Sequence, residues 1–202
     1  MTRIKLCGLR SEADVSAVLE LRPEYAGFIL SGGFRRSISH GDFYKLSEML
    51  AGSSILRVGV FVNEPLDSLA GFVGKLDLIQ LHGSENDDYI RSLREVTDKP
   101  VIKAFTVRSE ADIEAARVSS ADYVLLDSGT GTGSTFDHSL IKDIGRPFFL
   151  AGGLASENVG EAIARFEPFA VDASSSLETD GIKDKTKMTA FVDAVRYPVA
   201  NP

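Results

Sequence analysis

The sequence predicts an α/β protein folded as a single-domain (β/α)8 barrel, or TIM barrel, over residues 1–202. Short apolar runs rich in branched residues recur along the chain, and segments with helix-start signals separate them. The runs are continuous rather than strictly alternating, which is typical of strands buried on both faces of a parallel sheet. Strands that alternate with helices throughout one domain indicate βα units. The eight runs are residues 4–7, 25–30, 55–61, 76–81, 101–105, 123–126, 148–151 and 169–173.

Helix-start signals lie between these runs. Residues 11–14 and 109–112 both read Ser-Glu-Ala-Asp, which places a hydroxyl cap three residues before a carboxylate. Acidic residues in the first turn also suit the positive end of a helix. Ser84 and Ser156 indicate two further starts, and the last helix is expected over about residues 186–196.

The third connection, residues 62–75, is the least helical in its pattern because it contains Pro65 and two glycines. The competing architecture is an open, doubly wound sheet. Eight strands favour the closed barrel, although an average unit of about 25 residues is short for that fold.

The composition is that of an ordinary globular protein, with 44% hydrophobic and 25% charged residues. A net charge of -7 argues against nonspecific binding to nucleic acid or to acidic lipid, but it leaves room for a local basic site that binds a small anion. No run approaches the roughly 18 apolar residues of a membrane helix, and residues 1–5 show no signal-peptide pattern. We therefore expect no nucleic-acid partner and no membrane partner. The sequence does not specify the oligomeric state, and a monomer is the default expectation for a small acidic barrel.

Cys7 is the only cysteine, so the chain cannot form an internal disulfide, and a reducing cytoplasm is the expected location. His40, His82 and His138 are far apart in the sequence, and no cluster of Cys and His has metal-site spacing. No structural zinc and no other metal is expected.

The loops after the seventh and eighth runs are rich in glycine and serine. In a barrel the active site forms at the C-terminal ends of the strands, and phosphate sites often use these two loops with a helix N-terminus. Gly152 and Gly153 allow backbone amides to approach an oxyanion, and Ser174 and Ser175 add further donors. The alternative is a tight turn followed by a serine helix cap. The two loops together favour a site for a phosphorylated small molecule.

Cys7 and Asp127 stand at the exits of the first and sixth runs. A lone cysteine is most often a buried small hydrophobe. Here it precedes a glycine and a capped helix, and a helix N-terminus favours the thiolate that acts as base or nucleophile. Desolvation at the end of an apolar strand would raise the pKa of Asp127 and suit it to act as an acid, unless it only caps the glycine-rich loop 129–133. A base and an acid facing each other across a barrel mouth is what proton-transfer isomerisation requires.

Two further polar residues follow strand ends. His82 is either a substrate contact or a histidine of the turn after the fourth run. Arg36, after the second run, is a candidate for binding a carboxylate by a bidentate contact. Its neighbour Arg35 is the alternative partner, or both arginines are simply solvated.

Several of these segments also form an ordered series of motifs. The motifs are residues 5–9 (KLCGL), 57–63 (RVGVFVN), 80–83 (QLHG), 125–127 with 131–133 and 135–137, 150–154 (LAGGL) with 157–159, and 171–175 (VDASS) with Glu178, Gly181, Lys183 and Asp184. Each motif alone is weak, but the ordered set is specific and extends from one end of the chain to the other. The sequence thereby resembles the phosphoribosylanthranilate isomerase family.

The resemblance implies an Amadori rearrangement in tryptophan biosynthesis, from N-(5'-phosphoribosyl)anthranilate to 1-(2-carboxyphenylamino)-1-deoxyribulose 5-phosphate, without a cofactor. Asp127 matches the general acid of the family and Cys7 matches the general base. Arg36 resembles the residue that holds the anthranilate carboxylate. A further set falls in the loops that hold the phosphate: Gly152, Gly153, Asp172, Ser174 and Ser175.

The sequence departs from the family pattern at several positions. Ser176 stands where glycine is usual, Thr130 where a second glycine is common, and His138 where tryptophan is common. Residues 31–36 lack the usual proline, which leaves the choice between the two arginines open. The alternatives are the related histidine-pathway isomerase, which resembles a twofold repeated barrel with aspartates as acid and base, and a noncatalytic phosphosugar-binding barrel.

Overall fold

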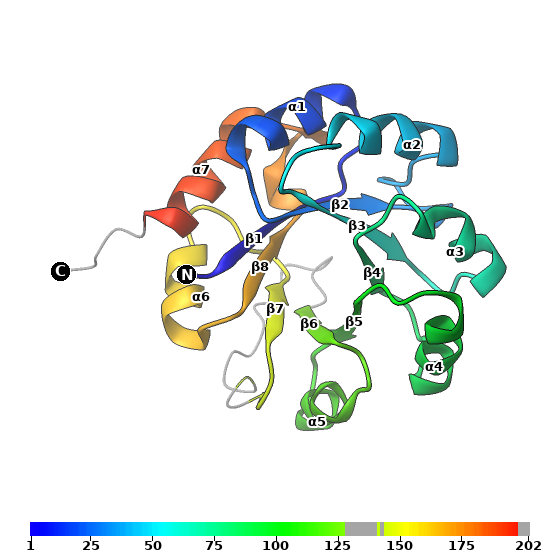
Figure 1. The fold of residues 1–202 in the computed structure, drawn as a ribbon. Helices are drawn as coiled ribbons and strands as arrows, with labels where there is room; N and C mark the ends of the chain where they lie inside the picture. The colour runs from blue at the N-terminus through cyan, green and yellow to red at the C-terminus, as the bar shows by residue number, and fades with distance from the viewer. Residues whose placement is uncertain (128–140, 142–143, 198–202) are drawn as a thin grey trace.

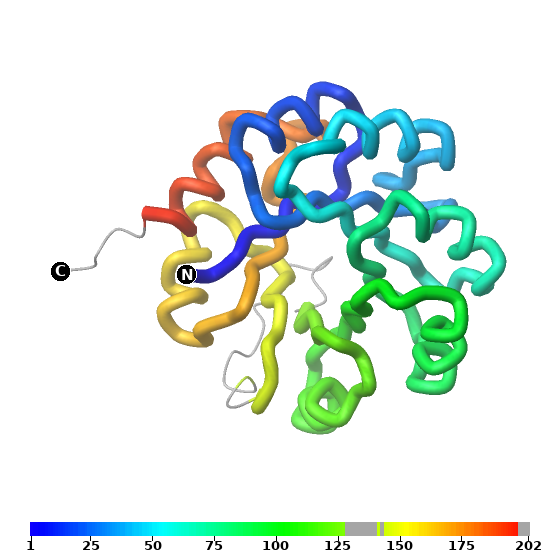
Figure 2. The backbone as a smooth tube through the Cα atoms, viewed as in Figure 1, coloured from blue at the N-terminus to red at the C-terminus, as the bar shows by residue number. Residues whose placement is uncertain are grey.

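A computed structural model of the chain describes residues 1–127, 141 and 144–197 (Figure 1). Eight parallel strands close into a barrel in the order β1 to β8, which confirms the predicted fold. The pairing of β1 with β8 closes the barrel, and the two strands run side by side in Figure 2. The strands are β1 (Arg3–Cys7), β2 (Tyr25–Ile29), β3 (Leu56–Phe61), β4 (Leu78–Leu81), β5 (Val101–Thr106), β6 (Tyr123–Asp127), β7 (Phe148–Ala151) and β8 (Ala170–Ala173).

Helices surround the barrel on its outside (Figure 1). The third connection does form a helix, and Pro65 stands at its N-cap, where proline costs no backbone hydrogen bond. In the sixth connection, residues 128–140 and 142–143 lie outside the described residues, and with them the glycine-rich loop and His138. The described helices are α1 (Glu12–Leu21), α2 (His40–Met49), α3 (Leu66–Val73), α4 (Asp87–Val96), α5 (Glu110–Val118), α6 (Val159–Phe166) and α7 (Lys185–Arg196).

The predicted capping boxes form at both Ser-Glu-Ala-Asp segments, which begin α1 and α5. At the other two starts the neighbouring asparagine takes the capping position. Asn86 caps α4 and accepts a hydrogen bond from the backbone of Tyr89, whereas the Ser84 hydroxyl donates to Asn63. Asn158 is likewise the N-cap residue of α6. Serine and asparagine are comparable N-caps, so the sequence alone did not decide between them.

Side chains alternate between the barrel interior and the layer beneath the helices. The outer layer is the larger apolar cluster, which includes Phe28, Phe43 and Phe61. The inner cluster is smaller, and its aromatic rings gather around Phe149, which lies 5.3 Å from Tyr25 and 5.8 Å from Tyr123 between ring centroids. The interior is therefore a packed core beneath the C-terminal rim.

The same alternation carries polar residues into the rim. Leu78, Leu125 and Ala170 belong to the inner cluster, and the residue two positions later in each strand is polar. A residue two positions along a strand faces the same side. Gln80, Asp127 and Asp172 therefore share the interior direction at the C-terminal end of the barrel.

After β8 the chain forms a short 3-10 helix, Ser175–Leu177, and then a two-stranded hairpin. The hairpin pairs β9 (Glu178–Thr179) with β10 (Ile182–Lys183), and Glu178 lies opposite Lys183. Gly181, at φ 78°, makes the turn between the strands.

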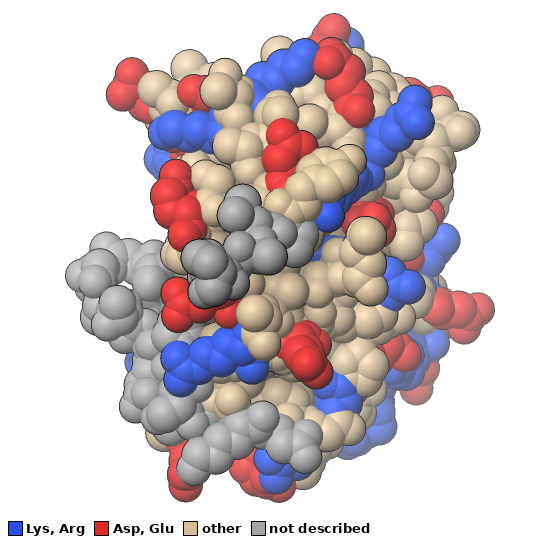
Figure 3. Space-filling model, turned by 90° about the vertical axis from the view of Figure 1, so that its left-hand side faces the viewer, with Lys and Arg blue, Asp and Glu red and all other residues tan. Residues whose placement is uncertain are grey.

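On the face drawn in Figure 3, acidic and basic side chains are interspersed rather than gathered by sign. None of the described helices has the length and apolar character needed to cross a bilayer.

Gly59 in β3 offers a test of how tightly the outer layer is packed. A Cβ there would lie 2.6 Å from Leu76, 2.8 Å from Phe61 and 3.0 Å from Leu30. Gly59→Ala is therefore expected to lower the free energy of unfolding by about 1–3 kcal/mol through overpacking. Urea denaturation measures this, with Gly160→Ala in α6 as a control, because a Cβ at that half-buried position would meet no described atom within 4 Å. Equal stability of the two variants would contradict the packing described.

Candidate active site

A cavity of about 220 Å³ opens at the C-terminal ends of the strands. Its walls come from strand ends around the barrel and from the loops after β7 and β8. Every site residue predicted from the sequence lines this cavity: Cys7, Arg36, His82, Asp127, Gly152, Gly153, Asp172, Ser174 and Ser175. Residues far apart in the sequence meet here because parallel strands end at one rim.

Cys7 is the last residue of β1 and only 6% exposed. Gly27 in the adjacent strand β2 makes room for the thiol, since a Cβ at Gly27 would lie 2.7 Å from Cys7 Sγ. Burial raises the pKa of the Cys7 thiol, and Asp172 adds to this effect, while the ammonium of Lys5 opposes both. In the ligand-free protein the net shift is upward, so the thiolate expected from the helix N-terminus is not the resting form.

Lys5 and Asp172 form a fully buried ion pair beneath Cys7. The Nζ atom of Lys5 lies 2.8 Å from Oδ2 of Asp172, and the two residues are register partners on β1 and β8. Burial alone would lower the pKa of Lys5, but the charges of Asp172 and Cys7 raise it, so the ammonium persists. The other carboxylate oxygen, Oδ1 of Asp172, is buried without a hydrogen-bond partner among the described residues and belongs to a residue that lines the cavity.

Asp127 ends β6 and lies beside His82, with 3.4 Å between His82 Nε2 and Asp127 Oδ2. The amide of Gln80 lies 2.9 Å from the other ring nitrogen, Nδ1. A donor from Gln80 at Nδ1 leaves the ring proton on Nε2, where it faces the carboxylate. His82 therefore orients Asp127 as well as lining the cavity.

The loops after β7 and β8 supply the expected anion-binding elements. Gly152 and Gly153 adopt φ angles of 92° and 66°, which glycine tolerates best, and this turn brings their backbone to the cavity wall. Ser174 Oγ donates to the backbone carbonyl of Cys7 at 3.0 Å. Ser176, one of the departures noted above, donates to the carbonyl of Leu154 at 2.5 Å and so ties the two loops together.

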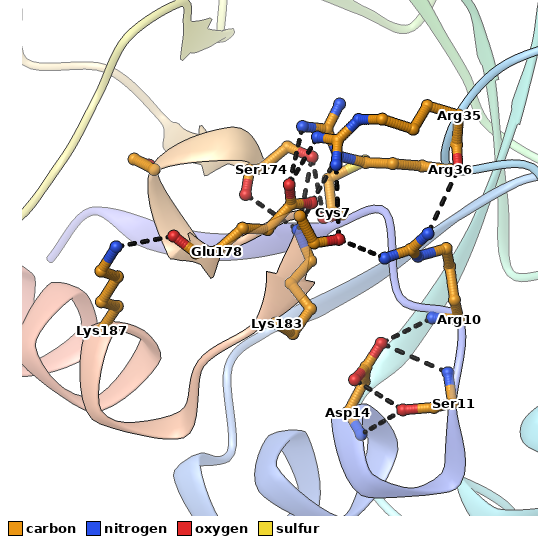
Figure 4. A network of polar contacts seen from close by, with 12 residues as sticks. Cys7, Arg10, Ser11, Asp14, Arg35, Arg36, Ser174, Glu178, Lys183 and Lys187 are labelled. Carbon is orange, nitrogen blue, oxygen red and sulfur yellow. Dashed lines mark hydrogen bonds and ion pairs between the residues drawn. The ribbon is translucent and has the colours of Figure 1, made fainter.

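The two arginines after β2 differ in position. Arg36 lines the cavity and its side chain is 19% exposed, whereas Arg35 is 54% exposed and does not line it. Both bind the carboxylate of Glu178 (Figure 4). Burial alone would raise the pKa of Glu178, but the hydrogen bonds from Arg36 and Arg35 lower it to about 2.

Sequence reasoning missed Lys5, Gln80 and Glu178 as parts of the site. A lysine inside an apolar strand, Ile4-Lys5-Leu6, was a usable signal, because lysine is almost never fully buried unless it is paired. No comparable local signal marks Gln80 or Glu178. Within the described residues no group of three or more His, Cys, Asp or Glu is arranged to hold a metal ion.

The arrangement is suited to proton transfer on a small anionic molecule. A thiol and a carboxylate face one cavity from β1 and β6, with a buried ammonium beneath the thiol. Glycine- and serine-rich loops and one arginine line the same cavity. Acid and base groups in one enclosed site are the requirement for general acid-base catalysis.

Comparison with known sequences agrees with this geometry. The family model for N-(5'phosphoribosyl)anthranilate (PRA) isomerase matches residues 4–194. A protein with the corresponding name from Endomicrobium trichonymphae is 39% identical over 203 residues, covering 97% of this chain and 99% of the relative. A relative from Clostridium acetobutylicum is 41% identical over 210 residues, with 97% and 98% covered.

Solved structures lead to the same group. Phosphoribosyl anthranilate isomerase from Thermotoga maritima has a TM-score of 0.87 at 36% identity and covers 97% of this chain and 99% of its own. A structure of such an isomerase in complex with reduced 1-(o-carboxyphenylamino)-1-deoxyribulose 5-phosphate has a TM-score of 0.85 at 35% identity, with the same coverage.

The low pKa of Glu178 predicts a pH-dependent contribution to stability. Because its folded pKa, about 2, is below its ordinary value of 4.5, the contribution is fully present above about pH 5 and disappears as the pH falls toward 2. Glu178→Gln is therefore expected to lower the free energy of unfolding at pH 7 by up to about 3 kcal/mol. Urea denaturation between pH 7 and about 2 should show the difference from the unaltered protein narrowing with acid; a constant difference would contradict the prediction.

Proposed function

The chain belongs to the N-(5'-phosphoribosyl)anthranilate isomerase family, and from that premise we propose that the cavity at its barrel rim carries out the family's reaction with Cys7 as base and Asp127 as acid. The reaction is a step of tryptophan biosynthesis. It converts an aminoaldose phosphate into an aminoketose phosphate, so the substrate is a phosphorylated small molecule that also carries a carboxylate.

The first step belongs to Asp127. Its carboxyl group protonates the ring oxygen of the ribose, the bond from that oxygen to C1' breaks, and the nitrogen lone pair forms an iminium at C1'. The nearby His82 orients the carboxyl group through the contact at 3.4 Å. Positioning of this kind supports a proton transfer that depends on hydrogen-bond reach.

The second step belongs to Cys7. Its thiolate removes the proton from C2', the electron pair of that C–H bond neutralises the iminium, and an enolamine forms. The enolamine then tautomerises to the ketone. The iminium is itself the electron sink that acidifies C2', which is why the reaction requires no cofactor. A proton-transfer group of this kind contributes about 10²- to 10⁴-fold to the rate.

One observation carries the proposal: Cys7 and Asp127 line the same cavity from strands on different sides of the barrel. The two successive proton transfers occur at neighbouring atoms of one sugar chain. A base and an acid that reach the same small cavity from different directions fit that requirement.

Two anion sites hold the ends of the substrate. Backbone amides of Gly152 and Gly153, together with Ser174 and Ser175, bind the phosphate at the loops after β7 and β8. Arg36 binds the anthranilate carboxylate, and this choice over Arg35 rests on its place in the cavity wall. Fixing both ends contributes much of the remaining rate enhancement by orientation.

Asp172 serves the substrate through its free carboxylate oxygen. Its Oδ2 is committed to Lys5 at 2.8 Å, but Oδ1 has no partner among the described residues and is placed to accept from a sugar hydroxyl. A carboxylate repels phosphate, so this assignment suits Asp172 better than a direct phosphate contact. The proposal also includes a cytoplasmic location, which the single cysteine supports, and a monomeric state, which the small size and acidic composition support.

The roles of Cys7 and Asp127 are tested by following the loss of anthranilate-type fluorescence as freshly made phosphoribosylanthranilate is consumed. Cys7→Ala and Asp127→Asn are each expected to lower kcat by about 10²- to 10⁴-fold, while the affinity for a reduced product analogue stays within about threefold. Undiminished turnover in either variant would remove that residue from its role. Binding without turnover in the unaltered protein would instead favour a noncatalytic phosphosugar-binding barrel.

The buried ammonium of Lys5 is expected to set the pH at which Cys7 ionises. Lys5→Met removes the positive charge that opposes the upward shift, so the thiol pKa should rise further. Because Cys7 is the only cysteine, the ultraviolet absorbance of the thiolate reports this group alone once the matching Cys7→Ala protein is subtracted, which cancels the contribution of the five tyrosines. The pKa that the pH profile of kcat/KM reports for this base should move to higher pH by the same amount.

Lys103→Met provides the matched control. Lys103 is also a buried lysine with a carboxylate partner, Glu85 at 3.0 Å, but Cys7 is not among the partners found for it. Lys103→Met is expected to lower the free energy of unfolding while leaving the pKa of the Cys7 thiol unchanged. If Lys5→Met and the control titrate alike, Lys5 does not act on the base.

A further inference from the structure

Glu178 lies at the centre of the cationic side of the site. Its side chain is 4% exposed and accepts hydrogen bonds from Arg36 Nε at 2.5 Å, Arg36 Nη2 at 3.0 Å and Arg35 Nη2 at 2.6 Å. Lys183 Nζ lies 3.3 Å away from it (Figure 4). These cations outnumber the carboxylate, so the cluster keeps a surplus of positive charge in a protein whose net charge is -7.

The contact between Glu178 and Arg36 is directional. Glu178 takes the edge of the guanidinium formed by Nε and Nη2, one carboxylate oxygen on each. A guanidinium has five N–H donors, and a second pair of parallel donors remains on the edge formed by Nη1 and Nη2. Among the described residues Arg36 Nη1 makes no hydrogen bond, and Arg36 lines the cavity. That second edge matches a carboxylate bidentately.

The surroundings fix both partners in place. The Arg36 stem passes so close to the end of β1 that a Cβ at Gly8 would lie 2.7 Å from Arg36 Cδ. The backbone carbonyl of Glu178 accepts from Lys187 Nζ at 2.6 Å, and Lys183 Nζ donates to the Ser174 carbonyl at 2.8 Å. The hairpin that carries Glu178 is thus anchored to α7 and to the loop after β8. A guanidinium held this way loses little side-chain entropy when it binds a ligand.

We infer that Glu178 is a positioning residue for carboxylate recognition: it holds Arg36 by one edge and leaves the other edge for the aromatic carboxylate of the substrate. The inference rests on the proposed role of Arg36 and adds the residue that makes Arg36 selective. Glu178 touches no substrate atom. Arg35 shares the same carboxylate from the exposed side and contributes no direct contact to the cavity.

The experiment compares two inhibitors that differ only in the carboxylate. One is reduced 1-(o-carboxyphenylamino)-1-deoxyribulose 5-phosphate, and the other is the same compound with an unsubstituted phenyl ring. Calorimetric titration gives Kd for each, and the ratio of the two values measures carboxylate recognition with the phosphate and sugar contacts held constant. The proteins are the unaltered chain, Glu178→Gln, Glu178→Asp, Arg36→Met and Arg35→Met.

Glu178→Gln is expected to weaken the carboxylate inhibitor by about tenfold and the phenyl inhibitor by less than about twofold. Glutamine keeps the size but loses the charge, and its amide nitrogen replaces one of the two oxygens that accept from Arg36. Glu178→Asp keeps the charge and should therefore retain part of the difference between the two Kd values. This variant also tests the inference if the glutamine variant does not fold. Arg36→Met should bring the ratio close to one. Arg35→Met, the control for loss of one cation near Glu178, should leave the ratio unchanged.

The outcomes distinguish the positioning role of Glu178 from the proposed role of Arg36 in binding the carboxylate. The positioning role of Glu178 alone is overturned if the Glu178 variants bind both inhibitors equally more weakly. It is also overturned if the ratio of the two Kd values stays intact in the Glu178 variants while Arg36→Met abolishes it. An equal drop of the ratio in Arg35→Met also overturns it, since simple charge loss would then explain the effect. A ratio that survives in Arg36→Met overturns the Arg36 assignment as well, whatever Glu178 does.

Discussion

The buried ion pair between Lys5 and Asp172 is the constraint on which the active end of the barrel depends. It joins the first strand to the last at the pairing that closes the barrel, with 2.8 Å between the charged atoms. Burying two charges is costly, and replacing such a pair by apolar residues is often neutral or stabilising. Its position therefore points to function: Cys7 is two residues beyond Lys5 and faces the same interior. The contact that closes the barrel also sets the charge beneath the proposed base.

Much of this architecture was predictable because the fold is periodic. Continuous apolar runs separated by capped helices left few topologies, and parallel strands of a barrel end at one rim. Cys7, His82 and Asp127 could thus be placed together from strand ends alone, without any knowledge of contacts, whereas Asp172 came from the resemblance to a family. The misplaced helix starts have a local cause. Serine and asparagine are comparable at an N-cap, so only the folded backbone decides that Asn86 and Asn158 stand there rather than the nearby serines.

The parts that the sequence did not reveal are pairings between distant residues. Lys5 meets Asp172 across 167 positions and Arg36 meets Glu178 across 142. Neither separation leaves a periodic signal, since a charged residue in a loop looks the same whether it is solvated or paired. The choice between Arg35 and Arg36 depends on side-chain direction, which adjacent positions in a loop do not specify. The resemblance to a family drew attention to Glu178 without saying what it does.

The upward shift of the Cys7 pKa is consistent with the order of steps in the proposed mechanism. In the free protein burial outweighs Lys5, and the thiol remains protonated. Ring opening by Asp127 creates a cationic iminium next to the carbon from which Cys7 takes a proton. A positive charge within a few ångströms lowers the pKa of a thiol by the same electrostatic attraction that Lys5 exerts. The acid step thus activates the base step. In the proposed mechanism the Cys7 thiolate therefore forms only while the iminium intermediate is present. Before ring opening, the ammonium of Lys5 already provides part of the stabilisation of that thiolate.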